Sequence, residues 1–209
     1  TMMAPDIIGL ALFKSASIIM AFVVSLHSWN ALQPMSYLGL DNYVKLFSDV
    51  EWWESVARSA QFTVFFVGMV YVGGLGLAVF LQSLKNRIQE TLRTIYFLPY
   101  AVSMVVAGII WLFMLQEKRG YMNAIVRAIG IDPLTYLSNS ATALFWVAFV
   151  FAWINVGYYM ILFLAAVKDI PQSLFDAAHI DGANPLQEFW HITLPQIREV
   201  STFVLIVTT

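Results

Sequence analysis

Residues 168–198 read KDIPQSLFDAAHIDGANPLQEFWHITLPQIR, and this segment decides the fold because of the two apolar runs that it separates. Residues 133–167 before it carry no charge, and another apolar run begins at residue 200. A membrane-spanning helix needs about 20 consecutive apolar residues, because about 30 Å of hydrocarbon is crossed at about 1.5 Å per residue. The segment is therefore expected to be a loop between two membrane-spanning helices.

Working outward from this loop, three further apolar runs are long enough to hold a span. Residues 59–84 and 94–116 are uncharged, and residues 7–26 contain a single charge, Lys14. This lysine lies near the inner end of its span, so its side chain can extend to the membrane surface. Together with the run before the loop, these runs predict four spans, and the run after the loop begins a fifth.

The composition agrees with a membrane protein. Of 209 residues, 60% are hydrophobic and 11% are charged, whereas soluble domains carry about 25% charged residues. The mean hydropathy is +0.74. The net charge of −2 leaves no basic surface for nucleic acid, and the absence of cysteine with three widely separated histidines offers no metal-ligand spacing. We expect an all-α fold, a polytopic bundle of transmembrane helices that forms a single domain over residues 1–209.

The loop itself is expected to contain two short helices. Asp169 can cap the first helix, with Pro171 in its opening turn, where the missing N–H costs little. Gly182 is placed to end that helix by taking a positive φ. One face of the helix carries residues at the spacing i, i+3, i+4 and i+7, namely Leu174, Ala177, Ala178 and Asp181.

A second helix is expected after Gly182. Asn184 can cap it, Pro185 fits its first position, and Gln187 lies three residues beyond the cap, as in a variant of the capping box. Pro195 is expected to limit its far end. Such a helix–glycine–helix segment can project from the membrane and receive another protein, or it can lie as an amphipathic loop on the lipid headgroups. The spacing alone leaves both alternatives open.

The same segment resembles a known signature. The spacing of seven residues matches the EAA signature of binding-protein-dependent ABC importer permeases, and they are Asp176, Ala177, Ala178, Gly182, Ile192, Leu194 and Pro195. Asp176 departs from the usual glutamate, but it keeps the charge on a side chain that is one methylene shorter. The resemblance implies that these residues couple the spans to an ATPase subunit. It also implies that residues 169–198 form a cytoplasmic coupling loop.

Features outside the loop resemble the carbohydrate branch of that family, the permeases of the maltose and glycerol-phosphate type. They are residues 39–43 with Phe47, Trp52 and Trp53, residues 120–130, Trp153 with Gly157, and residues 163–166 with 170–171. Within residues 120–130, apolar side chains at helical spacing predict a short helix that Gly130 ends. The resemblance implies a sugar as the solute. A phosphorylated polyol, a peptide or an amino acid is the alternative.

The resemblance also implies a larger assembly. Permeases of this branch usually have six spans, so the chain is expected to lack the end of the fifth and all of the sixth, at its C-terminus. Two homologous permeases form the pathway, two ATPase subunits or domains bind ATP and Mg²⁺, and an extracytoplasmic binding protein delivers the solute for alternating access. The chain is expected in the bacterial inner membrane with a cytoplasmic N-terminus. Lys and Arg do not decide this orientation, because five fall in the loops of each side.

The sequence itself supports this division of labour. It contains no Gly-rich loop followed by Lys-Ser or Lys-Thr, so ATP binding of the P-loop kind is not expected, and the glycines of residues 73–76 are expected to permit close helix packing. An intramembrane enzyme needs ionisable or nucleophilic groups clustered inside its spans, and no such cluster is evident. A non-transporting scaffold has no reason to keep the full signature spacing. We therefore expect a transport subunit without enzymatic activity or a cofactor of its own.

The fourth predicted span holds candidates for the solute pathway. They combine aromatic faces with hydrogen-bonding groups, which suits a sugar, and they are Trp153, Asn155, Tyr158 and Tyr159. Asn155 is the strongest candidate of the four, because an amide that faces lipid is costly. The alternative for each residue is ordinary packing between helices or anchoring at the membrane surface.

Overall fold

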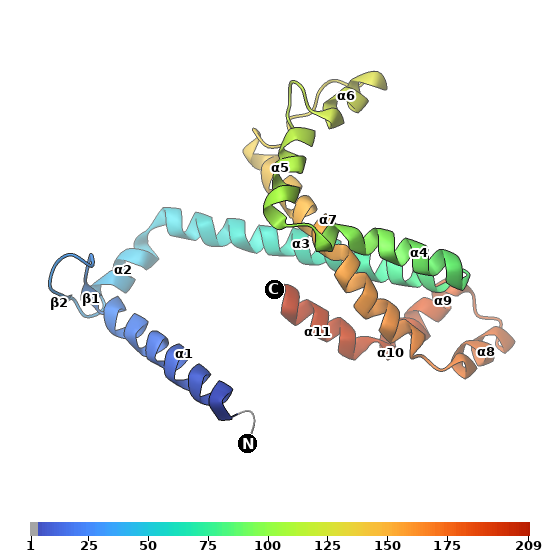
Figure 1. The fold of residues 1–209 in the computed structure, drawn as a ribbon, viewed down its shortest axis with the longest axis horizontal. Helices are drawn as coiled ribbons and strands as arrows, with labels where there is room; N and C mark the ends of the chain where they lie inside the picture. The colour runs from blue at the N-terminus through green and yellow to red at the C-terminus, as the bar shows by residue number, and fades with distance from the viewer. Residues whose placement is uncertain (1–3) are drawn as a thin grey trace. The chain divides into compact units, whose positions relative to one another are not determined.

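The computed structural model describes residues 4–209, and most of them are helical (Figure 1). The chain divides into two compact units, with the boundary between Ala57 and Arg58. This boundary falls inside the long helix α3, Val50–Gln82. The all-α prediction is confirmed, with one short two-stranded ribbon as the exception among the described residues.

The first unit contains two helices, the ribbon and the first turns of α3, and the elements before α3 are α1 Ala4–Ser25, β1 His27–Ser28, β2 Ser36–Tyr37 and α2 Asp41–Ser48. The two strands pair antiparallel. Asn42 ties the start of α2 to the end of α1, because its side-chain amide donates to the carbonyl oxygens of Ser25, at 2.9 Å, and His27, at 3.0 Å. The segment 39–43 thus fixes how the chain turns from α1 into α2.

The second unit consists of helices on both sides of the polar loop. Before the loop it contains the rest of α3 and then α4 Asn86–Phe97, the 3-10 turn η1 Leu98–Ala101, α5 Met104–Met114, α6 Tyr121–Ala128 and α7 Ser140–Lys168. After the loop it contains α11, Arg198–Thr208. Helix α7 is the central element, because it packs against η1, α4, α5 and α11 (Figure 1).

Two hydrophobic clusters hold α7 in place. The larger cluster joins it to α3 and α11 through buried side chains that include Val70, Phe163 and Val204. The smaller cluster joins it to α5 through Ala107 and Ile154. Lipid tails are as apolar as these side chains, so close van der Waals packing rather than transfer out of water holds such helices together.

Glycines let α7 approach its neighbours closely. A Cβ placed on Gly74 of α3 would lie 3.3 Å from the backbone nitrogen of Met160. Gly157 of α7 has even less room, because a Cβ there would overlap the carbonyl oxygen of Tyr96 and lie 2.8 Å from the Cα of Phe97. The close packing predicted for the glycines of α3 is confirmed at Gly74, and Gly157 adds a contact with the end of α4.

Within residues 4–209, three helices are long and apolar enough to cross a membrane, and they are Ile7–Ser25 of α1, α3 and α7. The run 94–116 is not the straight span that its composition predicts. Residues 86–101 and α5 meet at a bend of 96°, and counting this pair as one span gives up to four. The break falls at Val102 and Ser103, whose ψ values of 140° and 132° are extended rather than helical. Helix α11 lies where the fifth predicted span begins.

The helix predicted within residues 120–130 is confirmed as α6. Gly130 has φ +79°, and its N–H donates to the carbonyl oxygen of Arg127 at 3.0 Å, which ends the helix. Asn123 of α6 is fully buried, and its amide nitrogen donates to the carbonyl oxygens of Glu117 and Leu134, both at 2.9 Å. This one side chain therefore holds the connection between α5 and α7 together.

Candidate functional site

The segment that follows α7 folds into short helices (Figure 1). They are α8 Gln172–Ile180, α9 Pro185–Glu188, the π-helical turn η2 Phe189–Thr193 and α10 Leu194–Gln196. We refer to residues 171–196 as the elbow. The predicted order of helix, glycine and helix is confirmed, since Gly182 lies between α8 and α9.

The start of α8 differs from the prediction. Pro171, not Asp169, is its N-terminal cap residue. Asp169 instead ends α7, and its backbone N–H donates to the carbonyl oxygen of Ala165 at 3.1 Å. The predicted cap is wrong because α7 continues to Lys168, which leaves Asp169 to end that helix. Between the two helices, Ile170 is buried in the larger cluster.

Gly182 ends α8 in the predicted way. Its φ is +77°, its N–H donates to the carbonyl oxygen of His179 at 3.2 Å, and the N–H of Ala183 donates to the carbonyl oxygen of Ala178 at 2.9 Å. This pair of bonds is typical of a helix that ends at glycine. No atom lies within 4 Å of a Cβ placed on Gly182, so the position needs glycine for its backbone conformation and not for space.

Helix α9 begins with the predicted capping box. The side chain of Asn184 accepts from the N–H of Gln187 at 2.9 Å, and the side chain of Gln187 accepts from the N–H of Asn184 at 2.9 Å. A further contact joins the two helices, because Nε2 of His179 lies 3.0 Å from Oε1 of Glu188. The elbow is thus held in shape by its own hydrogen bonds.

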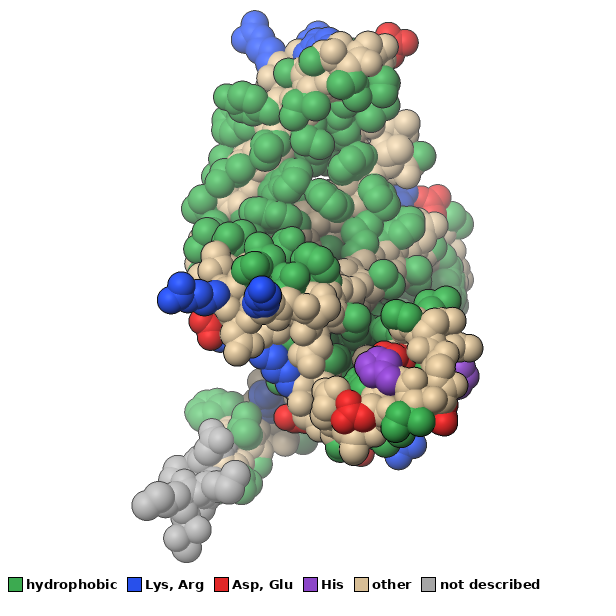
Figure 2. Space-filling view, turned by 90° about the vertical axis from the view of Figure 1, so that its right-hand side faces the viewer, with side chains coloured by type: hydrophobic (Ala, Val, Ile, Leu, Met, Phe, Trp, Pro, Cys, Tyr) green, Lys and Arg blue, Asp and Glu red, His purple; other side chains and the backbone are tan. Residues whose placement is uncertain are grey.

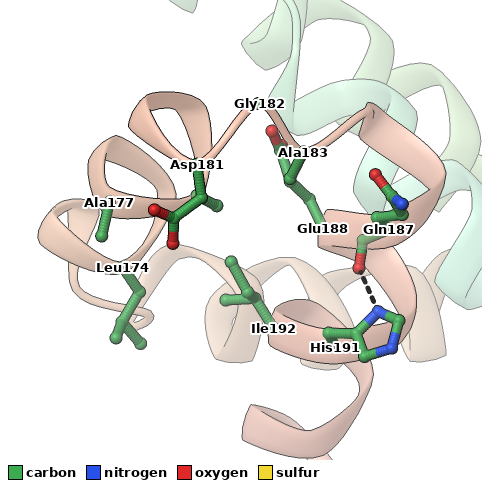
Figure 3. A pocket seen from close by; sticks show the side chains of 10 residues that line it. Leu174, Ala177, Asp181, Gly182, Ala183, Gln187, Glu188, His191 and Ile192 are labelled. Carbon is green, nitrogen blue, oxygen red and sulfur yellow. Dashed lines mark hydrogen bonds between the residues drawn. The ribbon is translucent and has the colours of Figure 1, made fainter.

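Helix α8 and the segment after Gly182 enclose a groove of about 460 Å³. In Figure 3 the two walls face each other across the turn at Gly182. One wall carries Leu174 and Ala177 of α8 and Asp181 at its C-terminal cap, and the facing wall carries Glu188, His191 and Ile192. Ala178 also lines the groove, so the α8 face predicted from helical spacing forms one wall. Its small alanine side chains leave room for the side chains or backbone of another molecule.

The signature residues do not all gather at this groove. Four of them line it, and they are Ala177, Ala178, Gly182 and Ile192. Asp176 is exposed on α8 outside the groove, and its Oδ1 accepts from Nε2 of Gln172 at 3.2 Å. The carboxylate and the alanines of the signature therefore point in different directions.

The last two signature residues lie at the base of the elbow. Leu194 packs against the larger hydrophobic cluster, and Pro195 is exposed beside it. Pro195 is predicted to limit the far end of the second helix, and the helical path ends at Gln196, one residue beyond it. The N–H of Leu194 donates to the carbonyl oxygen of Phe189, five residues back. This widened turn carries the hydrogen-bond register past the proline, which has no N–H to donate.

Charged and apolar side chains are separated on the surface. Figure 2 shows a broad apolar area, with histidine and acidic side chains grouped at the lower right, over the elbow. Sequence reasoning missed Glu188, which lines the groove and pairs with His179. No helical spacing signals this pair, because a turn separates the two residues. In residues 4–209, no group of three or more histidine and acidic side chains is placed to hold a metal ion.

Two candidates for the solute pathway pack against other aromatic rings. Trp153 meets Trp111 of α5 edge to face, with ring centres 5.4 Å apart. Tyr158 stacks on Tyr100 of η1 at 5.0 Å. Trp153 lies on a different side of α7 from Asn155, since two residues correspond to about 200° of helix.

The other two candidates differ in their exposure. Tyr159 is 7% exposed and belongs to the larger hydrophobic cluster, which is the position of a packing residue. Asn155 is half-buried, and its amide nitrogen donates to the carbonyl oxygen of Phe151, one turn earlier, at 2.8 Å. Asn155 and Tyr158 are one turn apart, so they share a face of α7 and remain the pair of interest.

Comparisons with known proteins give a consistent picture. Residues 71–209 match the sequence model of a family described as binding-protein-dependent transport system inner membrane component. Over 190 residues the chain is 36% identical to the probable ABC transporter permease protein YurN of Bacillus subtilis (strain 168), with 89% of this chain and 65% of that protein covered. Over 189 residues it is 36% identical to the sn-glycerol-3-phosphate transport system permease protein UgpA of Shigella flexneri, with 86% and 62% covered. The chain thus spans 62–65% of the length of these two relatives.

A solved structure is similar in fold. A chain from a bacterial alginate ABC transporter in complex with an alginate pentasaccharide-bound periplasmic protein superposes with a TM-score of 0.86. The match covers 99% of this chain and 69% of that chain, at 22% sequence identity. At this identity the likeness establishes the fold alone.

Proposed function

The chain belongs to the family of binding-protein-dependent transport system inner membrane components, and we propose that it is a permease subunit of an ATP-driven sugar importer. The observation that carries this proposal is the elbow. Two short helices meet at a glycine with positive φ, and small signature residues face an open groove. A scaffold or an intramembrane enzyme would need neither feature.

The elbow would be the contact with an ATPase subunit. Ala177 and Ala178 leave space in the groove for a partner's backbone or side chains, and Asp176 offers a carboxylate to a cation beside it. Phe175 of α8 packs against the larger cluster, as do Ile192 and Leu194 beyond Gly182, so a force on the elbow would reach the bundle. Closure of the ATPase subunits on ATP would then turn the spans outward, and hydrolysis would reset them. In this scheme ATP and Mg²⁺ bind to the ATPase and not to this chain.

The contact with an ATPase would also fix the orientation. An elbow between α7 and α11 that meets a cytoplasmic ATPase places the elbow ends of both helices on the cytoplasmic side. Counting back through four spans, with the bent pair of residues 86–101 and α5 taken as one of them, then gives a cytoplasmic N-terminus. The chain would form half of the pathway with a second, homologous permease, while an extracytoplasmic binding protein delivers the solute. Two ATPase subunits or domains complete the importer.

A sugar is the first candidate for the solute. Hydroxyl groups suit the amide of Asn155 and the phenol of Tyr158, which share a face of α7, and Trp153 offers an aromatic face from another side of the helix. Residues 140–167 carry no charged side chain, so a neutral solute fits α7 better than a charged one does. Tyr159 would support Tyr158 from behind.

A phosphorylated polyol is the second candidate, because one relative is by name an sn-glycerol-3-phosphate permease. Its phosphate would need a cation from another part of the assembly. Competition between unlabelled sugars and glycerol 3-phosphate for uptake separates the two candidates. Inhibition by the phosphorylated polyol alone would reject the sugar.

Substitution of Gly182 in the full-length protein tests the coupling role. A β-branched residue at φ +77° is strongly strained, whereas asparagine adopts this conformation more readily. We expect Gly182→Val to insert into the membrane normally and to lose uptake, and Gly182→Asn to keep much of it. Because the space beside Gly182 is open, the pair of variants isolates the backbone conformation. Normal uptake by Gly182→Val would remove the elbow from the coupling mechanism.

A pull-down of the full-length protein in mild detergent tests the assembly. We expect an ATPase, a second permease and a binding protein to be recovered and identified by mass spectrometry. A matched pair of variants at one position probes the groove: Ala177→Trp should lose the ATPase, and Ala177→Ser, whose side chain stays small, should keep it. Recovery of no ATPase, where a control importer stays assembled, would favour the scaffold or the enzyme.

A further inference from the structure

Three helices of the second unit meet at one buried amide, the side chain of Gln89 in α4. This side chain is 5% exposed. Its Nε2 donates to the carbonyl oxygen of Leu81 at 2.7 Å, and its Oε1 accepts from Nζ of Lys168 at 2.6 Å. Leu81 lies in the last turn of α3, and Lys168 is the last residue of α7. Both ends of the amide are therefore occupied, one by each neighbouring helix.

Packing alone does not require a polar residue at this position. A leucine has a similar volume and would avoid the cost of removing an amide from water. The amide adds two directional bonds of fixed length, which set the distance from the end of α3 to the end of α7. The ammonium group of Lys168 is favourably placed, because cations are stabilised at the C-terminal ends of helices.

The position of Lys168 relates this junction to the elbow. Only Asp169 and Ile170 separate it from Pro171, the cap residue of α8, and Ile170 is anchored in the larger cluster. A displacement of α8 would therefore be passed to Lys168 over a very short path. The hydrogen bond from Lys168 to Gln89 would pass this displacement to α4. Helix α4 is followed by η1 and then by the bend before α5.

We propose that Gln89 is a positioning residue that passes movement of the elbow to α3 and α4. The signature of the coupling loop contains neither Gln89 nor Lys168. The inference rests on the proposed importer function, because a displacement of the elbow requires an ATPase that moves it. It adds a second route into the bundle beside the direct connection from the elbow to α7 and α11.

The test uses the complete importer in proteoliposomes, with solute uptake and ATP hydrolysis measured on the same sample. Gln89→Leu removes both bonds at similar volume, and Lys168→Met removes the bond to α7 alone. We expect both variants to hydrolyse ATP and to lower the solute imported per ATP by at least about fivefold. Lys168→Arg keeps a donor and should stay close to the wild type. Thr91→Leu, at an exposed position of α4, is the matched control and should also stay close.

The ratio of uptake to hydrolysis separates positioning from a merely structural role. If Gln89→Leu lowers both rates equally, so that the ratio keeps its wild-type value, the proposal is overturned. If Gln89→Leu fails to assemble, the same ratio is measured for Lys168→Met, whose position is exposed. A wild-type ratio in that variant would likewise overturn the proposal. The double variant should be no worse than Gln89→Leu, because both changes break one linkage. A wild-type chain that binds no ATPase would overturn the proposed function and, with it, this inference.

Discussion

Gly157 of α7 gives the sharpest test of the packing. We predict that Gly157→Ala destabilises the protein, although alanine is the better helix former. The backbone at the end of α4 lies directly against this glycine. A Cβ would overlap the carbonyl oxygen of Tyr96 and lie 2.8 Å from the Cα of Phe97, and neither backbone atom can rotate away.

The magnitude follows from the geometry. An ordinary contact begins at 3.4 Å, so α7 and Phe97 must separate by at least 3.4 − 2.8 = 0.6 Å. Overpacking of this kind destabilises a protein by about 1–3 kcal/mol. Because the contacts here are with backbone atoms, we expect a penalty at the upper end of this range. The higher helix propensity of alanine offsets about 1 kcal/mol of the penalty. The expected net loss is about 2 kcal/mol, which corresponds to a fall in Tm of roughly 4–8 °C.

Thermal unfolding of the detergent-purified chain, followed by tryptophan fluorescence, measures this loss. Gly68→Ala is the matched control, because it lies in α3 with no atom within 4 Å of the added Cβ. The control should unfold at or slightly above the wild-type temperature. A Gly157→Ala protein as stable as the wild type would refute the close contact between α7 and the end of α4.

Three further substitutions test separate features. Asn184→Ala removes the capping box with Gln187 and should destabilise α9 by about 1 kcal/mol. Amide hydrogen exchange in α9 should become faster, and an unchanged exchange rate would contradict the capping role. Asn123→Asp replaces a buried donor by a carboxylate that faces the carbonyl oxygen of Leu134. The free energy of unfolding should fall by about 1–3 kcal/mol, and a wild-type unfolding temperature would contradict that loss. Asn155→Leu should reduce uptake at low solute concentration with normal protein levels, and wild-type uptake would exclude this residue from the pathway.

Local rules account for the parts of the fold that the sequence predicts well. Gly182 and Asn184 act through hydrogen bonds to residues within five positions of them, so their roles are visible in a short stretch of sequence. The helix that Gly130 ends is predictable for the same reason. The predicted cap at Asp169 is wrong because this residue belongs to the end of the preceding helix, whose exact length the apolar run does not define.

Long-range contacts account for the rest. The bend of 96° before α5 lies inside an apolar run, and the chain turns at Val102 and Ser103, where composition gives no sign of it. Gln89 and Lys168 are 79 positions apart in the sequence, and neither belongs to a recognisable spacing. The buried position of Tyr159 depends on packing against other helices. Such features require the tertiary structure.

Under the proposed mechanism, the difference between locally determined and long-range features has a functional reason. A surface that transmits force must keep its shape before its partner binds, because a flexible elbow would absorb the movement of the ATPase. The elbow therefore carries its own structural bonds, the capping box and the turn at Gly182, and these same local bonds make it predictable from sequence. In that mechanism the solute pathway would lie between two chains and would change shape during transport, so its residues would carry no comparable local constraint. A coupling loop should then be the part of such a permease that is most readily predicted from sequence. The residues that determine solute specificity should be the least readily predicted.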